Sequence, residues 1–152
     1  MSDPRPFRVT AALATLALTT LGLGPCGPIP GGGLAGEDFG EPVKDWTFVN
    51  DVPRCAVEVR PADPHSVTVN CMSWEQRLFV SCSFCEGKTW SGIALDQPEG
   101  RIRIGERVYP VRLSRVDDAA LLDAVWRARA SKLEAEPSPR PDGWWTFELR
   151  SR

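Results

Sequence analysis

Residues 66–82 read SVTVNCMSWEQRLFVSC, and this stretch decides the fold. Apolar and polar residues alternate in each half, as they do in strands that bury one face. The residues on these apolar faces are Val67, Val69 and Cys71 in the first half and Leu78, Val80 and Cys82 in the second. A short turn near Trp74–Gln76 joins the halves, so the stretch predicts an antiparallel hairpin.

The flanking sequence predicts further strands and two helices. Before the hairpin, Cys55–Arg60 alternates in the same way and ends at a proline-rich turn. After it come a short helix and a second hairpin whose tight turn is Gly105–Glu106. Asp117 or Asp118 can cap a longer helix. The predicted elements are a short helix over 88–95, strands over 101–104 and 107–116, a helix with the apolar stripe Leu122, Val125, Trp126 and Leu133, and a last strand over 144–149.

This order of elements defines the expected fold class. It is mainly β with two helices, and about six antiparallel strands are expected to form a small barrel or curled sheet with the helices packed outside. The folded domain is expected to span residues 37–152, a size that buries one core.

The amino terminus has the pattern of an export signal. Arg5 and Arg8 precede an apolar, leucine-rich run from Val9 to Gly24, which is slightly shorter than the roughly 20 residues of a bilayer span. Residues 26–36 are mostly glycine, proline and small apolar residues, which are typical of a linker. We therefore expect a signal peptide over 1–25, a linker over 26–36 and a domain that works outside the cytoplasm.

Cys26 lies where the apolar run ends. Leu23-Gly24-Pro25-Cys26 resembles the lipobox of bacterial lipoproteins, in which the cysteine is acylated and becomes the new amino terminus. Pro25 departs from the small residue usual before that cysteine. The expectation is an exported protein held at the membrane by lipid on Cys26, with an uncleaved signal anchor or plain secretion as the alternatives.

The composition argues against nucleic-acid binding. The formal net charge of the chain is −2, and removing residues 1–25 takes away two cations and one acid, so the mature domain is slightly more acidic. A nucleic-acid-binding domain usually carries a strong basic excess.

Four further cysteines lie in the expected domain, namely Cys55, Cys71, Cys82 and Cys85. An even number in an oxidising compartment favours two disulfides, and the sequence leaves the three possible pairings open. The spacing of Cys82 and Cys85 also leaves two alternatives, a redox-active pair or part of a four-cysteine zinc site.

The order of short motifs resembles the split β-barrel superfamily of flavin and deazaflavin oxidoreductases, the pyridoxamine-phosphate-oxidase-like proteins. The motifs are Arg77-Leu78-Phe79-Val80, Lys88-Thr89-Trp90, Ile93-Ala94-Leu95-Asp96-Gln97-Pro98, Arg101-Ile102-Arg103-Ile104-Gly105, Arg107-Val108-Tyr109-Pro110-Val111 and Arg115-Val116-Asp117-Asp118. The resemblance covers roughly residues 55–130 and implies a split barrel that often dimerises. Ser91-Gly92 stands where the family commonly has an Arg-Asn pair for the cofactor phosphate.

The resemblance implies a set of cofactor-binding residues. Lys88 would hold a phosphate and Trp90 would lie beside a flavin or deazaflavin ring, with Arg101 and Arg103 as further anion partners. An ordinary reading of the arginines is a solvated sheet face that pairs with nearby acids. His65, the single histidine, is expected in a solvated turn, with no triad near it.

Three functions remain open from the sequence. The first is a membrane-tethered binding or structural domain for a small anionic or aromatic ligand, with no certain cofactor. The second is an FMN- or deazaflavin-dependent oxidoreductase. The third is a cysteine-based redox or zinc protein. No catalytic residue can be assigned from the sequence.

Overall fold

The computed structural model describes residues 31–152, so the expected signal segment and Cys26 lie outside the described residues. The strands are β1 (Glu37–Asp38), β2 (Cys55–Val59), β3 (His65–Trp74), β4 (Arg77–Cys82), β5 (Glu99–Ile104), β6 (Arg107–Arg115) and β7 (Trp145–Ser151). The helices are α1 (Thr89–Asp96), α2 (Ala119–Lys132) and two short 3-10 helices, η1 (Thr47–Asp51) and η2 (Cys85–Gly87). None of the helices within 31–152 is long and apolar enough to cross a membrane.

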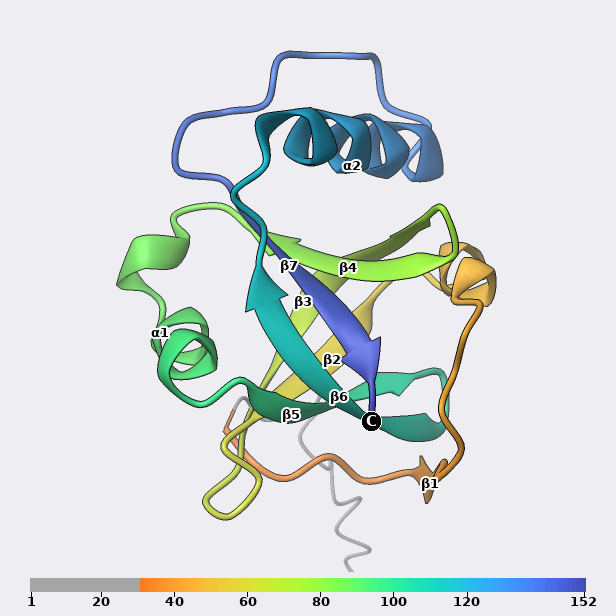
Figure 1. Ribbon diagram of the computed structural model, residues 1–152, viewed down its shortest axis with the longest axis vertical. Helices are drawn as coiled ribbons and strands as arrows, with labels where there is room; N and C mark the ends of the chain where they lie inside the picture. The colour runs from red at the N-terminus through yellow and green to blue at the C-terminus, as the bar shows by residue number, and fades with distance from the viewer. Residues whose placement is uncertain (1–30) are drawn as a thin grey trace, which may run out of the picture.

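Six strands close into a barrel in the order β6-β5-β2-β3-β4-β7, and pairing between β6 and β7 completes it. Each of the six strands is antiparallel to both of its neighbours in the barrel, while β1 adds two residues parallel to β6. Figure 1 shows α2 lying across the outside of β4 and α1 beside the barrel. The predicted fold class, mainly β with two helices and about six antiparallel strands, is confirmed.

The core fills the barrel interior because alternate strand residues point inward. Its members include Val57, Val59, Leu78, Val80, Ile102, Val111, Leu113, Phe147 and Leu149, none more than 2% exposed. The predicted antiparallel hairpin is confirmed, and in it Cys71 lies opposite Val80.

The helix α2 covers the outer face of β3 and β4. Val125 packs there against Met72 of β3 and Phe79 of β4, both almost fully buried. This second cluster of buried residues holds α2 on the barrel. It therefore also determines where the side chains of α2 lie.

The amino end of α2 agrees with the sequence prediction, whereas its carboxyl end does not. Asp118 caps the amino end, as expected, and its carboxylate accepts a 2.7 Å hydrogen bond from the Leu121 amide. Leu133 was expected in the apolar stripe but is 44% exposed. The helix ends at Lys132, so the helical period no longer directs Leu133 toward the sheet.

The four cysteines form two disulfides, Cys55–Cys71 and Cys82–Cys85. The first joins β2 to β3 inside the core, and the second closes the turn between β4 and η2. This selects one of the three pairings that the sequence left open.

The described part of the expected linker lies against the barrel. The Gly31 amide donates to the Ser66 carbonyl at 3.2 Å, and the Leu34 amide donates to the Glu58 carboxylate at 2.6 Å. The chain then continues into β1, so residues 31–38 cover the outer side of β2 and β5 that Glu58 occupies.

An ion pair clasps β4 to β7 on the outer face. Arg77 makes two hydrogen bonds to Glu148, of 3.1 and 2.8 Å, and this pairing lowers the pKa of the Glu148 carboxyl below its usual value. A carboxyl with a lowered folded-state pKa contributes stability above its unfolded pKa and loses it as pH falls through the folded value.

We expect the free energy of unfolding of the wild-type protein to fall more steeply between about pH 5 and pH 3 than that of Glu148→Gln, because only the wild type must protonate this carboxyl. Urea unfolding at several pH values measures the difference. Parallel curves for the two proteins would contradict it.

Candidate functional site

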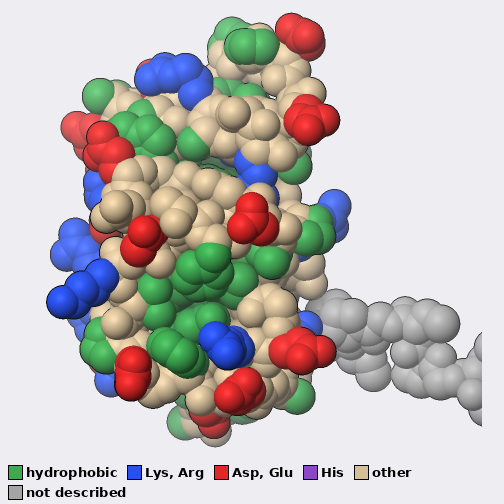
Figure 2. Space-filling model, turned by 90° about the vertical axis from the view of Figure 1, so that its right-hand side faces the viewer, with side chains coloured by type: hydrophobic (Ala, Val, Ile, Leu, Met, Phe, Trp, Pro, Cys, Tyr) green, Lys and Arg blue, Asp and Glu red, His purple; other side chains and the backbone are tan. Residues whose placement is uncertain are grey.

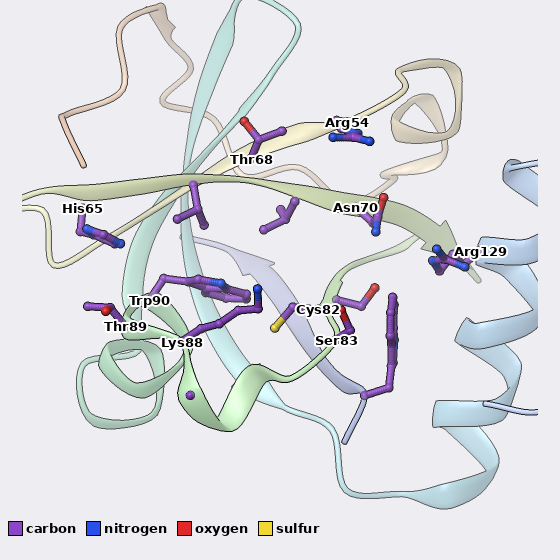
Figure 3. Close-up of a pocket in the computed structure, with 15 residues that line it drawn as sticks. Arg54, His65, Thr68, Asn70, Cys82, Ser83, Lys88, Thr89, Trp90 and Arg129 are labelled. Atoms are coloured by element: carbon purple, nitrogen blue, oxygen red, sulfur yellow. The ribbon is translucent and has the colours of Figure 1, made fainter. Parts of the chain in front are cut away.

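A groove opens where β3 and β4 separate. Residues 65–69 of β3 pair with β2, but β4 pairs with β3 only from Asn70 onward and ends at Cys82. The chain then turns away through η2 into α1. The cavity left here has a volume of about 760 Å³, and Figure 3 shows its lining side chains between β3, the η2–α1 turn and α2. Those residues are Arg54, His65, Val67, Thr68, Val69, Asn70, Ser81, Cys82, Ser83, Gly87, Lys88, Thr89, Trp90, Arg129 and Trp144.

The lining is cationic. Arg54, Lys88 and Arg129 belong to it, and none of its described members is Asp or Glu. The formal charge of the whole chain is −2, so this groove is a local exception. A concave surface with cations and no carboxylate favours an anionic ligand.

Arg129 is positioned by two aromatic rings and has no acidic partner among the described residues. Its guanidinium carbon lies 4.9 Å from the ring centroids of both Trp126 and Trp144. A 2.7 Å hydrogen bond from the Trp126 indole to the Ser138 carbonyl fixes one of these rings. The Arg129 Nε is buried, has no hydrogen-bond partner in the described residues, and burial lowers the pKa of the guanidinium. This side chain is therefore positioned and still has an unused donor.

Lys88 lies across the groove at the start of α1. It is the N-cap residue, its side chain is exposed, and no side chain caps the helix. Its own amide donates to the Cys85 carbonyl at 3.0 Å, which fixes the turn. The first amides of a helix are unpaired donors at the positive end of the dipole, so they add to the charge of the Lys88 side chain.

Trp90, which the resemblance placed beside a cofactor ring, lines the groove but is packed into the barrel core. It is only 4% exposed, and its ring centroid is 5.4 Å from that of Phe147 in the barrel core. Trp90 therefore closes the inner end of the groove rather than offering a face to a ligand ring. Trp144, which is half-buried and also lines the groove, offers the better aromatic surface.

Arg101 and Arg103 lie outside this groove. Arg101 makes two 2.7 Å hydrogen bonds to the fully buried Glu58, which raises the pKa of the guanidinium. Arg103 donates to the Ala35 carbonyl at 3.3 Å and lines a separate cavity of about 210 Å³. The structure thus brings Lys88 and Trp90 together but not the two arginines with them.

Three further arginines on or next to the same hairpin also pair with acids. The pairs are Arg107 with Glu37 at 3.8 Å, Arg112 with Glu99 at 3.6 Å and Arg115 with Asp117 at 3.7 Å. Exposed pairs of this kind contribute little to stability.

Three groove residues were not anticipated from the sequence. Arg54 and Arg129 are 75 positions apart in the sequence, and both line the groove only because α2 folds back over β3. His65 was expected in a turn, but it begins β3 opposite Val59 and lines one end of the groove. A local pattern carries no signal for such a convergence.

A second hollow has a different character. Figure 2 shows hydrophobic side chains gathered on the face that carries the segment between β1 and η1, with charged groups around them. The cavity measures about 350 Å³, and its aromatic walls are Phe39, Phe48 and Tyr109. Its rim holds charges of both signs, so it does not select an anion as the groove does.

Metal binding finds no support within residues 31–152, where no group of three or more His, Cys, Asp or Glu is placed to hold an ion. The four cysteines, for which the sequence left a zinc site open as an alternative to disulfides, are bridged, and a bridged sulfur offers no thiolate. Fold and site together define a small split-barrel protein with a cation-lined groove.

Solved structures share this fold, whereas no family model and no curated protein matches the sequence. A pyridoxamine 5′-phosphate oxidase candidate from Listeria innocua has a TM-score of 0.56 at 9% identity, over 68% of this chain and 87% of that one. A 5-nitroimidazole antibiotic resistance protein candidate from Bacteroides thetaiotaomicron has 0.56 at 7%, over 73% and 82%. An FAD-binding protein from Mesorhizobium loti has 0.51 at 11%, over 69% and 85%. The fold is thus the split barrel that the sequence resemblance predicted.

Proposed function

We propose that this chain is an exported, membrane-tethered split-barrel domain that binds a small anionic ligand with an aromatic part in the groove between β3, α1 and α2. The observation that carries the proposal is that Arg54, Lys88 and Arg129 line one cavity whose described lining contains no carboxylate. A concave surface whose charges are all positive favours an anion.

Phosphate is the anion that these groups suit best. An arginine presents a planar fork of donors, a lysine a compact charge, and a helix amino end further amides, and all three bind phosphate oxygens. Trp144, beside Arg129, would contact the aromatic part. Binding needs no catalytic group, so the proposal stands without one.

A flavin or deazaflavin cofactor fits this groove in part. Lys88 and the first amides of α1 would hold its phosphate, and Trp144, not the buried Trp90, would contact its ring. When bound, such a cofactor supplies hydride or electron transfer. The alternative function is therefore a flavin- or deazaflavin-dependent oxidoreductase. Native mass spectrometry with a visible spectrum separates the two, because a resident flavin adds both mass and yellow colour, and bare polypeptide mass counts against it.

Each groove cation should contribute to ligand affinity. With FMN as the probe, we expect Lys88→Gln and Arg129→Gln each to weaken binding by about tenfold or more, because each removes a charge-assisted hydrogen bond of about 1.5–3 kcal/mol. Calorimetric titration measures this. Arg103→Gln is the matched control and should leave affinity unchanged, and equal losses in all three variants would contradict a site in the groove.

The membrane tether is tested separately. Because Cys26 is the proposed acylated residue, Cys26→Ala should move the protein from the membrane fraction to the soluble extracytoplasmic fraction. Immunoblotting of fractionated cells measures the distribution. Retention of the variant in membranes would favour an uncleaved signal anchor instead.

A further inference from the structure

We propose that the Cys82–Cys85 disulfide is redox-active and exchanges with a thiol that enters the groove. This activity is separate from ligand binding. The bridge lies in the wall of the groove, but its reaction with a thiol requires no bound ligand. All four cysteines belong to the core cluster, but the two disulfides among the described residues differ in span and in the cavity that they border. This difference carries the inference.

The Cys55–Cys71 bridge has the features of a structural disulfide. Its cysteines are 3% and 1% exposed, belong to the barrel core, and join two strands of the closed sheet over a sequence separation of 16. A bridge over a longer loop restricts the unfolded chain more. Cys55 borders the separate cavity of about 210 Å³, but this bridge is less exposed than Cys82 and offers an external thiol less access.

The Cys82–Cys85 bridge spans a sequence separation of only 3, so it restricts the unfolded chain less than the other bridge does. It follows the end of β4, at the point where the barrel splits. Cys82 lines the groove, and Figure 3 shows its sulfur among the lining side chains, on the side of Lys88. This bridge therefore adds less stability than the core bridge, and it borders the larger cavity, from which a thiol could approach Cys82.

Access within the bridge is asymmetric. Cys82 is 8% exposed and borders the cavity, whereas Cys85 is fully buried. An incoming thiolate would attack the Cys82 sulfur, and Cys85 would be the leaving group. This order is fixed by the fold and can be tested with single variants.

The exchange balances with a dithiol as the reductant. Its first thiolate bonds to the Cys82 sulfur, the Cys82–Cys85 bond breaks, and Cys85 leaves with the electron pair as a thiolate. Its second thiolate then attacks its own sulfur in the mixed disulfide and releases Cys82. Two electrons pass to the protein, the dithiol becomes a disulfide, and its two protons pass to the two cysteines.

The surroundings favour the thiolates that this exchange needs. Lys88 is three residues after Cys85, and its amide donates to the Cys85 carbonyl at 3.0 Å, which keeps the amino end of α1 beside the bridge. A lysine and a helix amino end both stabilise a thiolate. Cys71 also has a lysine near its sulfur, the Lys132 amine at 4.0 Å, but Lys132 lies at the carboxyl end of α2. The groove has no described carboxylate to oppose this.

Phe84, between the two cysteines, marks the place where a partner would dock. It is 82% exposed, and its φ of 53° lies in the left-handed region that bulky residues seldom adopt. The bridged turn thus holds an aromatic side chain in solvent next to the reactive sulfur. An exposed aromatic at such a point suits contact with a protein that carries the attacking dithiol.

The test uses the oxidised protein with reduced glutathione as the probe, followed by quenching with an alkylating agent and peptide mass analysis. We expect Cys82–Cys85 to open at least roughly tenfold faster than Cys55–Cys71 while tryptophan fluorescence remains native. Lys88→Gln should slow the opening by roughly threefold or more, with the effect largest below the pKa of a free thiol. Opening of both bridges at the same rate, or only on unfolding, would overturn the proposal.

Single variants test the direction of attack. Cys85→Ser, incubated with oxidised glutathione, should form a mixed disulfide on Cys82, and Cys82→Ser should leave the buried Cys85 unmodified. Modification of Cys85 alone would contradict the assigned order. Because these assays contain no groove ligand, failure of the exchange leaves the anion-binding proposal standing, and loss of FMN binding leaves the exchange untouched.

Discussion

Arg101→Met is expected to lower the free energy of unfolding by about 3 kcal/mol, because it leaves the carboxylate of Glu58 buried without its ionic partner. Glu58 is fully buried and accepts two 2.7 Å hydrogen bonds from Arg101. Its remaining bond comes from the Leu34 amide at 2.6 Å. The Arg101 side chain is 31% exposed, so water can partly replace it, and the expected loss is at the low end for buried pairs.

The matched control is Arg103→Met, on the same strand and the same face. Arg103 makes one 3.3 Å hydrogen bond, to a backbone carbonyl, and its removal should change stability by only about 0.5 kcal/mol. Urea unfolding of both variants at neutral pH measures the two losses. If the Arg103 variant lost as much as the Arg101 variant, the buried pair would not be the cause.

Removal of the core disulfide by Cys55→Ala with Cys71→Ala is the second large effect, with an expected loss of about 3 kcal/mol from loop entropy alone. The bridge closes a loop with a sequence separation of 16 and joins neighbouring strands. Both sulfurs are packed in the barrel core, so their loss also leaves space among buried side chains.

The corresponding double variant of Cys82 and Cys85 should lose less, about 2 kcal/mol on the same reasoning for a sequence separation of 3. Chemical unfolding of both double variants under oxidising conditions gives the comparison. A greater loss for the Cys82–Cys85 pair would contradict the division into one structural and one reactive bridge.

The barrel could be predicted from the sequence because its strands show a local period. The alternation of Val67, Val69 and Cys71 fixes which face of β3 enters the core, and a short turn makes β4 its antiparallel neighbour. The cap at Asp118 is local in the same sense. Closure between β6 and β7 joins distant segments, and the order of motifs rather than any one of them indicated it.

The candidate site was predicted only in part because its charges come from distant segments. The motif around Lys88 pointed to that residue. Arg54 and Arg129 line the groove only because α2 packs on β3 and β4, which no local motif indicates. Glu58 alternates with apolar neighbours as an exposed residue would, yet residues 31–38 cover its face and Arg101 pairs with it. The sequence therefore left Arg101 open as an anion partner or as a surface residue, whereas the structure pairs it with the buried Glu58.

The groove and the Cys82–Cys85 bridge lie on the same surface of the protein, so the same charged groups can act on both. Lys88 lies beside both the cavity and the Cys82–Cys85 turn, so the same positive end of α1 would favour a bound anion and a thiolate. An occupied groove should then hinder thiol entry. The two proposals can still fail independently, since Arg129 takes no part in the exchange and Cys85 is not among the lining residues.

The measurement that tests the central claim most directly is a calorimetric titration of the wild-type domain with FMN and, side by side, with riboflavin, which has the same ring system and no phosphate. FMN is expected to bind at least about tenfold more tightly than riboflavin, because only its phosphate engages the groove cations. Equal affinity for the two compounds, or no binding of FMN, would contradict an anion-selective groove.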